Sequence, residues 1–134
     1  MFEFNNNKLI NEMLDKKKWA IVGATKRETK FGYEILMTLK NYGYEVYPIN
    51  PNYDDIKGIK CYPSLKDIPV EVDCVDVVVP AKKSINIIDE VKELGIENIW
   101  FQPGTYSNEV LEKSHAMGLN TVFEDCVIVE LRNR

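Results

Sequence analysis

The sequence alternates between short apolar segments and amphipathic segments, and this alternation is what most constrains the fold. Five short runs are rich in residues that favour β-strands; they cover residues 18–23, 44–50, 72–80, 98–102 and 121–124. Between them, apolar residues recur at helical spacing within residues 35–42, 87–94 and 110–117. Strands that alternate with helices form parallel sheets through right-handed crossovers. We therefore expect an α/β fold, a doubly wound sheet of about five parallel strands with helices on both faces.

Glycines and serines mark the ends of the predicted helices. Three glycines follow the helical segments, where a left-handed residue closes the last turn: Gly43, Gly95 and Gly118. Ser84 and Ser107 stand at positions that suit N-caps.

Two further segments complete the predicted domain. Residues 1–17 read as an amphipathic helical extension, and prolines interrupt residues 50–72, which predict one short helical turn at most. We expect residues 1–134 to form a single domain.

Composition excludes several classes of function. The chain of 134 residues has 17 basic and 21 acidic residues and a net charge of −4, which argues against a nucleic-acid binder. Its apolar runs are far shorter than the roughly 20 residues that cross a bilayer, and its start lacks the order of a signal peptide. Cys61, Cys74 and Cys126 form no CxxC pair, and the single histidine, His115, leaves no metal-ligand cluster. We expect a cytoplasmic protein without a metal site.

The segment after the first predicted strand is the strongest candidate for a phosphate-binding loop. It reads GATKRETKFG and precedes a helix. Gly23 permits a tight exit from the strand, and Gly32 permits close approach of a backbone or a ligand. Lys26, Arg27 and Lys30 outnumber the one acidic residue of the loop, and a helix N-terminus offers free N–H groups to an anion. From these residues alone, a plain connection is an equally good interpretation.

The loop does not match the motifs of other nucleotide-binding classes. It has neither the G-x-x-x-x-G-K-S/T of P-loop NTPases nor the G-x-G-x-x-G of dinucleotide-binding domains. The second strand ends at Asn50, where an NAD-binding domain offers an acidic residue to the ribose. Pro80 follows the third strand, where a phospho-acceptor domain needs an aspartate. A redox-sensing NAD(P)-binding module is disfavoured but stays an alternative.

The strand ends together resemble a known family. The segments GATKRETKFG, YPINP, CYPSL, VDVVVPA, WFQPG and FEDCVIVE follow one another within residues 17–131. This order is similar to that of the small stand-alone CoA-binding proteins, which resemble the Rossmann-like CoA-binding domain of the succinyl-CoA synthetase α subunit. The resemblance implies that coenzyme A or an acyl-CoA binds across the carboxyl ends of the strands. The residues implied for this site are Gly23, Ala24, Thr25, Lys26, Arg27, Lys30, Phe31, Gly32, Asn50, Pro51, Val79, Pro80, Ala81, Gln102, Pro103 and Gly104.

The resemblance implies that the chain binds CoA and does not imply that it catalyses the ligation reaction of the synthetases. The synthetases need a catalytic histidine and a partner domain, whereas His115 lies in a predicted helix away from the strand ends. The other residues provide no Ser-His-Asp, Cys-His or paired-carboxylate arrangement. We expect a non-catalytic binding or regulatory module, and a ligand-free protein-interaction scaffold is a further alternative.

Several residues carry two interpretations each. Phe31 packs on the core, as we expect, or on the adenine of the ligand. Cys126 is a small buried residue, as we expect, or a thiol that forms a disulfide with CoA under oxidation. Four aromatic residues are either core or the apolar surface of a homodimer: Phe2, Phe4, Trp100 and Tyr106.

Overall fold

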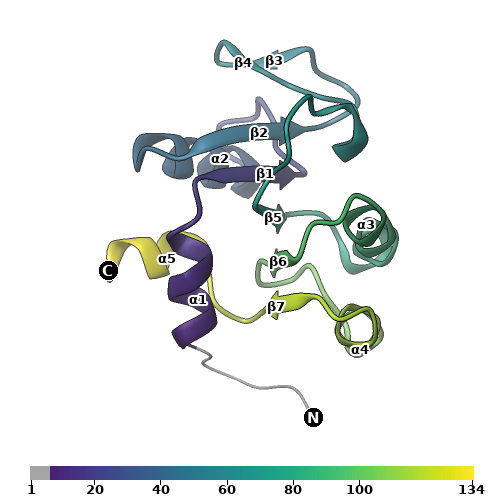
Figure 1. Ribbon diagram of the computed structural model, residues 1–134. Coiled ribbons are helices and arrows are strands. Elements are labelled where there is room, and N and C mark those ends of the chain that lie inside the picture. The colour runs from purple at the N-terminus through teal and green to yellow at the C-terminus, as the bar shows by residue number, and fades with distance from the viewer. Residues whose placement is uncertain (1–6) are drawn as a thin grey trace.

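A parallel sheet of five strands runs through the middle of the molecule, which the computed structural model describes over residues 7–134 (Figure 1). In spatial order the strands are β2 (Glu45–Ile49), β1 (Lys18–Val22), β5 (Cys74–Val77), β6 (Asn98–Phe101) and β7 (Asn120–Val122). The pairings between neighbouring strands are all parallel, which confirms the predicted sheet. The strand order reverses between β1 and β5, because the chain first builds outward to β2 and then returns to β5.

Helices cover both faces of this sheet, which confirms the doubly wound architecture (Figure 1). One layer holds α1 (Asn7–Leu14), α2 (Phe31–Asn41) and α5 (Val127–Arg132), and the other holds α3 (Ala81–Glu93) and α4 (Asn108–Ala116). Successive side chains of β1 point to opposite faces, so Trp19 packs in the first layer and Ala20 in the second. Every residue of β5 is buried, as expected of a strand that is covered on both faces.

The predicted helix ends are confirmed with one exception. The three helix-ending glycines all have positive φ: Gly43 (93°), Gly95 (75°) and Gly118 (75°). The Ser107 side chain accepts a backbone N–H of the first turn of α4, as an N-cap does. The prediction for Ser84 is wrong, because α3 begins earlier, after Pro80. Ser84 is buried inside α3, and its hydroxyl donates to the Thr105 carbonyl at 2.7 Å, which ties α3 to the β6–α4 loop.

A small hairpin lies beyond β2, at the top of Figure 1, where the sequence predicts only irregular structure. Its strands β3 (Asp55–Ile56) and β4 (Ile59–Lys60) pair antiparallel. Lys57 and Gly58 both have positive φ, of 52° and 81°, as a tight hairpin turn requires. Strands of two residues are too short to show an alternating pattern. The 3-10 helix η1 (Leu65–Asp67) matches the predicted short turn.

The two terminal helices close the first layer. Three apolar residues of α1 are buried, and the Tyr44 hydroxyl donates to the Leu14 carbonyl at the end of α1. Arg134, beyond α5, forms an ion pair with Asp15, beyond α1. The helix α5 is not predicted from the sequence, because its Val-Ile-Val start favours a strand.

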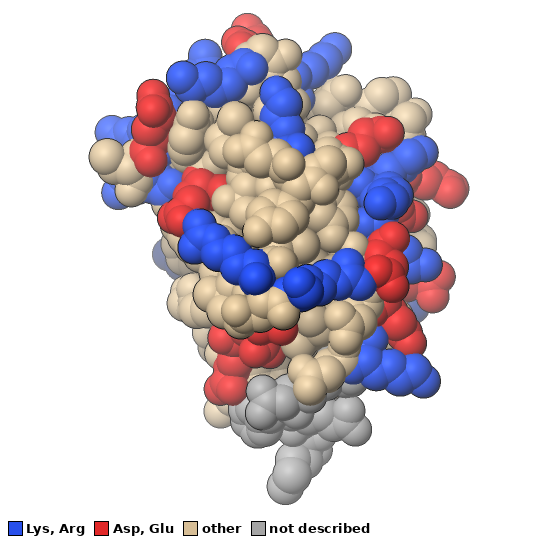
Figure 2. Space-filling view, turned by 90° about the vertical axis from the view of Figure 1, so that its left-hand side faces the viewer, with Lys and Arg blue, Asp and Glu red and all other residues tan. Residues whose placement is uncertain are grey.

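Exposed charges of both signs surround the first layer. Figure 2 shows the side on which α1 and α5 lie in Figure 1, with acidic and basic side chains interspersed around an uncharged central area. Within residues 7–134, no helix combines the length and the apolar character needed to span a membrane.

The aromatic residues considered for a homodimer surface are placed differently from one another. Trp100 is completely buried, so it belongs to the core. Tyr106 is half-buried and packs edge-on against Phe123, with ring centroids 5.5 Å apart. Phe2 and Phe4 lie outside the described residues.

Candidate functional site

The chain leaves β1 and β5 toward opposite faces of the sheet, which opens a crevice at the carboxyl ends of these two neighbouring strands. Strand β1 leads through residues 23–30, here called the β1–α2 loop, to α2 in the first layer. Strand β5 leads through residues 78–80 to α3 in the second layer. Open parallel sheets bind their ligands at such a switch point. The carboxyl ends of β1 and β5 are therefore the expected place for a ligand-binding site.

Two glycines let the β1–α2 loop pack directly on its surroundings. Gly23 has a φ of 100°, and a Cβ atom there would lie 2.7 Å from the Val78 carbonyl oxygen. A Cβ atom at Gly32 would lie 2.2 Å from the Gly23 carbonyl oxygen, so the start of α2 touches the exit of β1. The loop is held by close contacts that only glycine permits at these two positions.

Asn50 fixes the same loop from the end of β2. Its Nδ2 donates to the carbonyl of the buried Ala24 at 2.9 Å, and its Oδ1 accepts the N–H of Asn52 at 2.9 Å. Both ends of the amide therefore already have protein partners. An NAD-binding domain would present a carboxylate to the ribose at this position, so the geometry gives the NAD(P) alternative no support.

Residues next to and within the hairpin support the tip of the β1–α2 loop. The hydroxyls of Thr25 and Tyr53 share a hydrogen bond of 3.1 Å, and Thr25 Oγ1 also accepts the Arg27 N–H at 3.2 Å. Lys26 Nζ lies 3.7 Å from Asp55 Oδ1 and 5.5 Å from the centroid of the Tyr53 ring. These contacts order the loop and leave the Lys26 side chain 50% exposed, within reach of a ligand.

The loop and the start of α2 present positive charge to solvent. Lys26, Arg27 and Lys30 are all exposed. Lys30 is the N-cap of α2, and its side chain accepts no N–H of the first turn. The N–H groups of Tyr33 and Glu34 bond to the Lys30 carbonyl, which leaves those of Phe31 and Gly32 for an anion. Phe31 is 39% exposed, so its expected place in the core is wrong; the buried stripe of α2 begins one residue later, at Gly32.

A cleft of about 350 Å³ adjoins this loop, and we call it the switch-point cleft. It is lined by Val22, Gly23, Ile49, Asn50, Pro51, Asn52, Pro63, Ser64, Leu65, Val79, Lys83, Ile87 and Glu90. Four of the predicted site residues are among them: Gly23, Asn50, Pro51 and Val79. The exposed Pro80 and the half-buried Ala81 lie at the start of α3, next to Val79.

Helix α3 contributes a wall of the switch-point cleft that the strand-end motifs do not predict. Lys83, Ile87 and Glu90 follow the i, i+4, i+7 spacing of one helix face. That spacing is the sequence signal that would have found them. Along this face, Lys83 lies at one end of the cleft and Glu90 at the other, with the apolar Ile87 between them. The cleft therefore has two ends of opposite charge.

The residues after β6 lie apart from the cleft. Gln102 is completely buried: its Nε2 donates to Asp76 Oδ1 at 2.8 Å, and its Oε1 accepts the Val127 N–H at 3.3 Å. The structure therefore does not bring the Gln102 side chain to a ligand-accessible surface. Pro103 and Gly104 are exposed at the same edge of the sheet.

Asp76 is an ionisable group hidden beneath this edge. Its side chain is completely buried on β5, and Oδ2 has no hydrogen-bond partner among residues 7–134. Burial raises the pKa of the carboxyl to about 8, and the hydrogen bond from Gln102 opposes this only in part. Asp76 is therefore protonated at neutral pH and acts as a structural group.

The cysteines and the histidine form no catalytic arrangement within the described chain. Cys61 and Cys74 are buried, and burial raises the pKa of both thiols. Cys126 is half-buried at the N-cap of α5, and all three thiols are free. His115 is exposed on α4. No group of three or more potential metal ligands occurs within residues 7–134.

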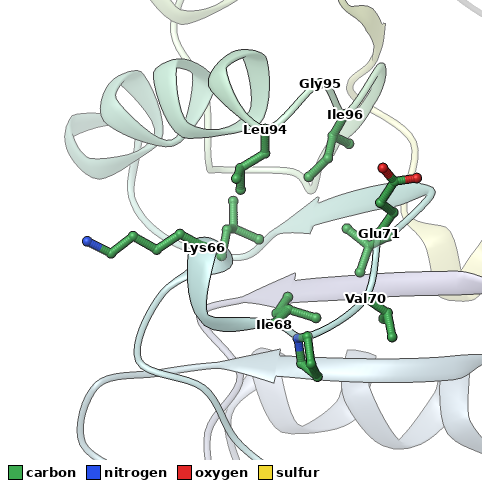
Figure 3. Close-up of a pocket in the computed structure, with 10 residues that line it drawn as sticks. Lys66, Ile68, Val70, Glu71, Leu94, Gly95 and Ile96 are labelled. Atoms are coloured by element: carbon green, nitrogen blue, oxygen red, sulfur yellow. The ribbon is translucent and has the colours of Figure 1, made fainter.

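A second cleft lies at the opposite, amino edge of the sheet. It measures about 410 Å³ and is lined by residues 65, 66, 68–72 and 94–96, which precede β5 and β6. Figure 3 shows Leu94 and Ile96 facing Ile68 across it, while the Lys66 side chain points away. It has neither the basic loop nor the open helix N-terminus of the switch-point cleft, so it is the weaker candidate for an anionic ligand.

Comparison with known proteins places this site in a family context. The family model described as "CoA binding domain" matches residues 17–132. An ADP-forming acetate–CoA ligase of Methanocaldococcus jannaschii is 42% identical over 81 residues, which are 60% of this chain and 12% of that ligase. The chain thus spans about an eighth of the length of that relative.

Relatives of similar length also exist. The uncharacterised protein YneT of Bacillus subtilis is 27% identical over 121 residues, which cover 90% of each chain. The structure of a hypothetical protein from Pyrococcus horikoshii superposes with a TM-score of 0.90 at 31% identity, over 99% of this chain and 98% of that one. The chain therefore belongs to the CoA-binding domain family, with the Rossmann-like fold of these neighbours.

Proposed function

We propose that this protein binds coenzyme A or an acyl-CoA reversibly at the carboxyl edge of its sheet, as a non-catalytic binding or regulatory module. One observation carries the proposal: an ordered basic loop and an open helix N-terminus adjoin a cleft at the switch point of the sheet. Phosphate groups and a nucleoside need these two kinds of surface side by side.

Each part of the ligand has a place in this arrangement. Lys26, Arg27 and Lys30 would neutralise the phosphates, together with the first-turn N–H groups of α2. The switch-point cleft would take the adenosine, because apolar residues form most of its walls. The pantetheine arm would leave past Pro80 toward Gly104, which is exposed at the same edge.

Family membership supports this reading, since the matching domain is described by its CoA binding. The matched ligase is several times longer than this chain, so the proposal covers CoA binding and not the ligase reaction. The free cysteines of the described chain support a reducing compartment such as the cytoplasm.

The test is an affinity measurement by isothermal titration calorimetry, with CoA, acetyl-CoA, NAD and ATP as ligands. We expect the CoA species to bind and the double variant Lys26→Glu/Arg27→Glu to lose this binding, because it reverses two charges beside the phosphates. The matched control is Lys40→Glu/Lys92→Glu, which changes the net charge equally at exposed positions in the last turns of α2 and α3. Thermal melting verifies that both variants fold.

The outcomes separate the alternatives. Unchanged CoA affinity in the loop variant would mean that the phosphates bind elsewhere. Tighter binding of NAD than of CoA would favour the NAD(P)-binding module. No heat with any nucleotide would leave a protein-interaction scaffold as the better account.

A further inference from the structure

The polar groups of the switch-point cleft fall into two classes: those that already have protein partners and those that do not. Both ends of the Asn50 amide are engaged, as described above. The Ser64 hydroxyl donates to Asp67 Oδ2 at 2.8 Å. Lys83 and Glu90 are different, because within residues 7–134 neither side chain forms a hydrogen bond or an ion pair. They are the charged groups of the cleft that remain for a ligand.

Glu90 is the more unusual of these two groups. Its carboxylate is half-buried, and burial raises its pKa. Lys66 opposes this effect from beyond ion-pair range, and the negative charge of Glu93 adds to it. A partly desolvated carboxylate without a donor is unfavourable, and a ligand that supplies an N–H group would relieve this cost.

The position of Glu90 indicates which part of a nucleotide it meets. Lys83 and Glu90 are seven residues apart on one face of α3, which is about 10 Å along the helix axis at the usual rise. Lys83 is near the start of α3, on the side of the β1–α2 loop, and Glu90 is farther from it. The span is comparable with the length of a nucleotide from its phosphate to the far edge of its base. The apolar Ile87 lies between them, where a ring would pack.

We propose that Glu90 reads the base of the bound nucleotide by accepting a hydrogen bond from an exocyclic amino group, and so selects adenine over a base with a carbonyl at that position. This inference rests on the proposed function, because it assumes that the nucleoside occupies the switch-point cleft. A carbonyl oxygen facing the carboxylate would replace an attraction by a repulsion between two acceptors.

The test compares CoA with its deaminated form, in which hypoxanthine replaces adenine, by calorimetry on the full chain. For the wild type we expect the deaminated form to bind at least about tenfold more weakly, the size of one hydrogen bond to a charged acceptor. In Glu90→Gln the discrimination should largely disappear, because the neutral amide donates as well as accepts. Glu112→Gln is the matched control, since Glu112 is exposed on the neighbouring helix α4 and does not line the cleft.

The outcomes distinguish this inference from the proposed function. Equal wild-type affinity for the two forms of CoA would overturn the role of Glu90 and leave CoA binding intact. Unchanged discrimination in Glu90→Gln would assign base reading to another residue. Absence of CoA binding by the wild type would overturn both.

Discussion

The buried carboxyl of Asp76 makes the stability of this domain depend on pH in a defined direction. Its pKa is raised from 3.8 in the unfolded chain to about 8 in the folded protein. The folded state therefore holds a proton that the unfolded state releases above pH 4, so the contribution of Asp76 to stability is highest at low pH and falls as pH rises toward 8. Each pKa unit corresponds to about 1.4 kcal/mol, so the shift from 3.8 to about 8 gives a loss of about 6 kcal/mol over this range.

The substitution Asp76→Asn removes this dependence while keeping the shape of the side chain. The amide oxygen can still accept the hydrogen bond from Gln102, and the amide cannot ionise. We expect the variant to gain stability over the wild type by about 1.4 kcal/mol per pH unit between pH 5 and pH 8. Urea unfolding at several pH values measures this difference, with the exposed Asp54→Asn as a control that should follow the wild type. A difference between Asp76→Asn and wild type that stays constant across this range would mean that Asp76 does not bind its extra proton in the folded state.

Two further predictions concern the β1–α2 loop. Gly32→Ala places a Cβ atom 2.2 Å from the Gly23 carbonyl oxygen, so we expect it to lower the free energy of unfolding by about 1–3 kcal/mol and to weaken CoA binding. Thermal unfolding and calorimetry check both effects, and an unchanged melting temperature would show that the contact can relax at no cost. Tyr53→Phe removes the hydrogen bond to Thr25 at the loop tip, and we expect CoA affinity to fall about threefold to tenfold. Calorimetry measures this change, and wild-type affinity in Tyr53→Phe would mean that the bond does not order the loop.

Local patterns in the sequence were sufficient to predict the sheet and most helices. The run of three valines at residues 77–79 has no polar alternation, which is typical of a strand that is covered on both faces, and the fully buried β5 lies within the predicted segment 72–80. The hairpin at residues 55–60 left no pattern, because its strands have two residues each. The helix α5 was missed because β-branched residues begin it, and its packing on the first layer overrides their preference.

The sequence was sufficient to predict those site residues that follow directly from the order of the strands along the chain. It was not sufficient for residues whose environment depends on packing between distant segments. Strand ends such as Gly23 and Asn50 meet at one edge of any parallel sheet, so their position follows from the topology. The burial of Gln102 depends on Asp76, which is 26 residues away and looks like an ordinary strand residue in the sequence. Glu90 shares a helix face with Lys83 and Ile87, which the sequence spacing shows, but that this face lines the switch-point cleft follows from the packing of α3 beside η1.

The most direct test of the account is to locate the bound ligand by amide chemical-shift mapping during a titration with CoA. If CoA binds at the switch-point cleft and the β1–α2 loop, the shifted amides belong to residues 23–32, 50–52 and 79–83, which surround them. Shifts confined to residues 68–72 and 94–96, around the cleft at the amino edge, would contradict binding at this site, as would a titration in which no amide moves.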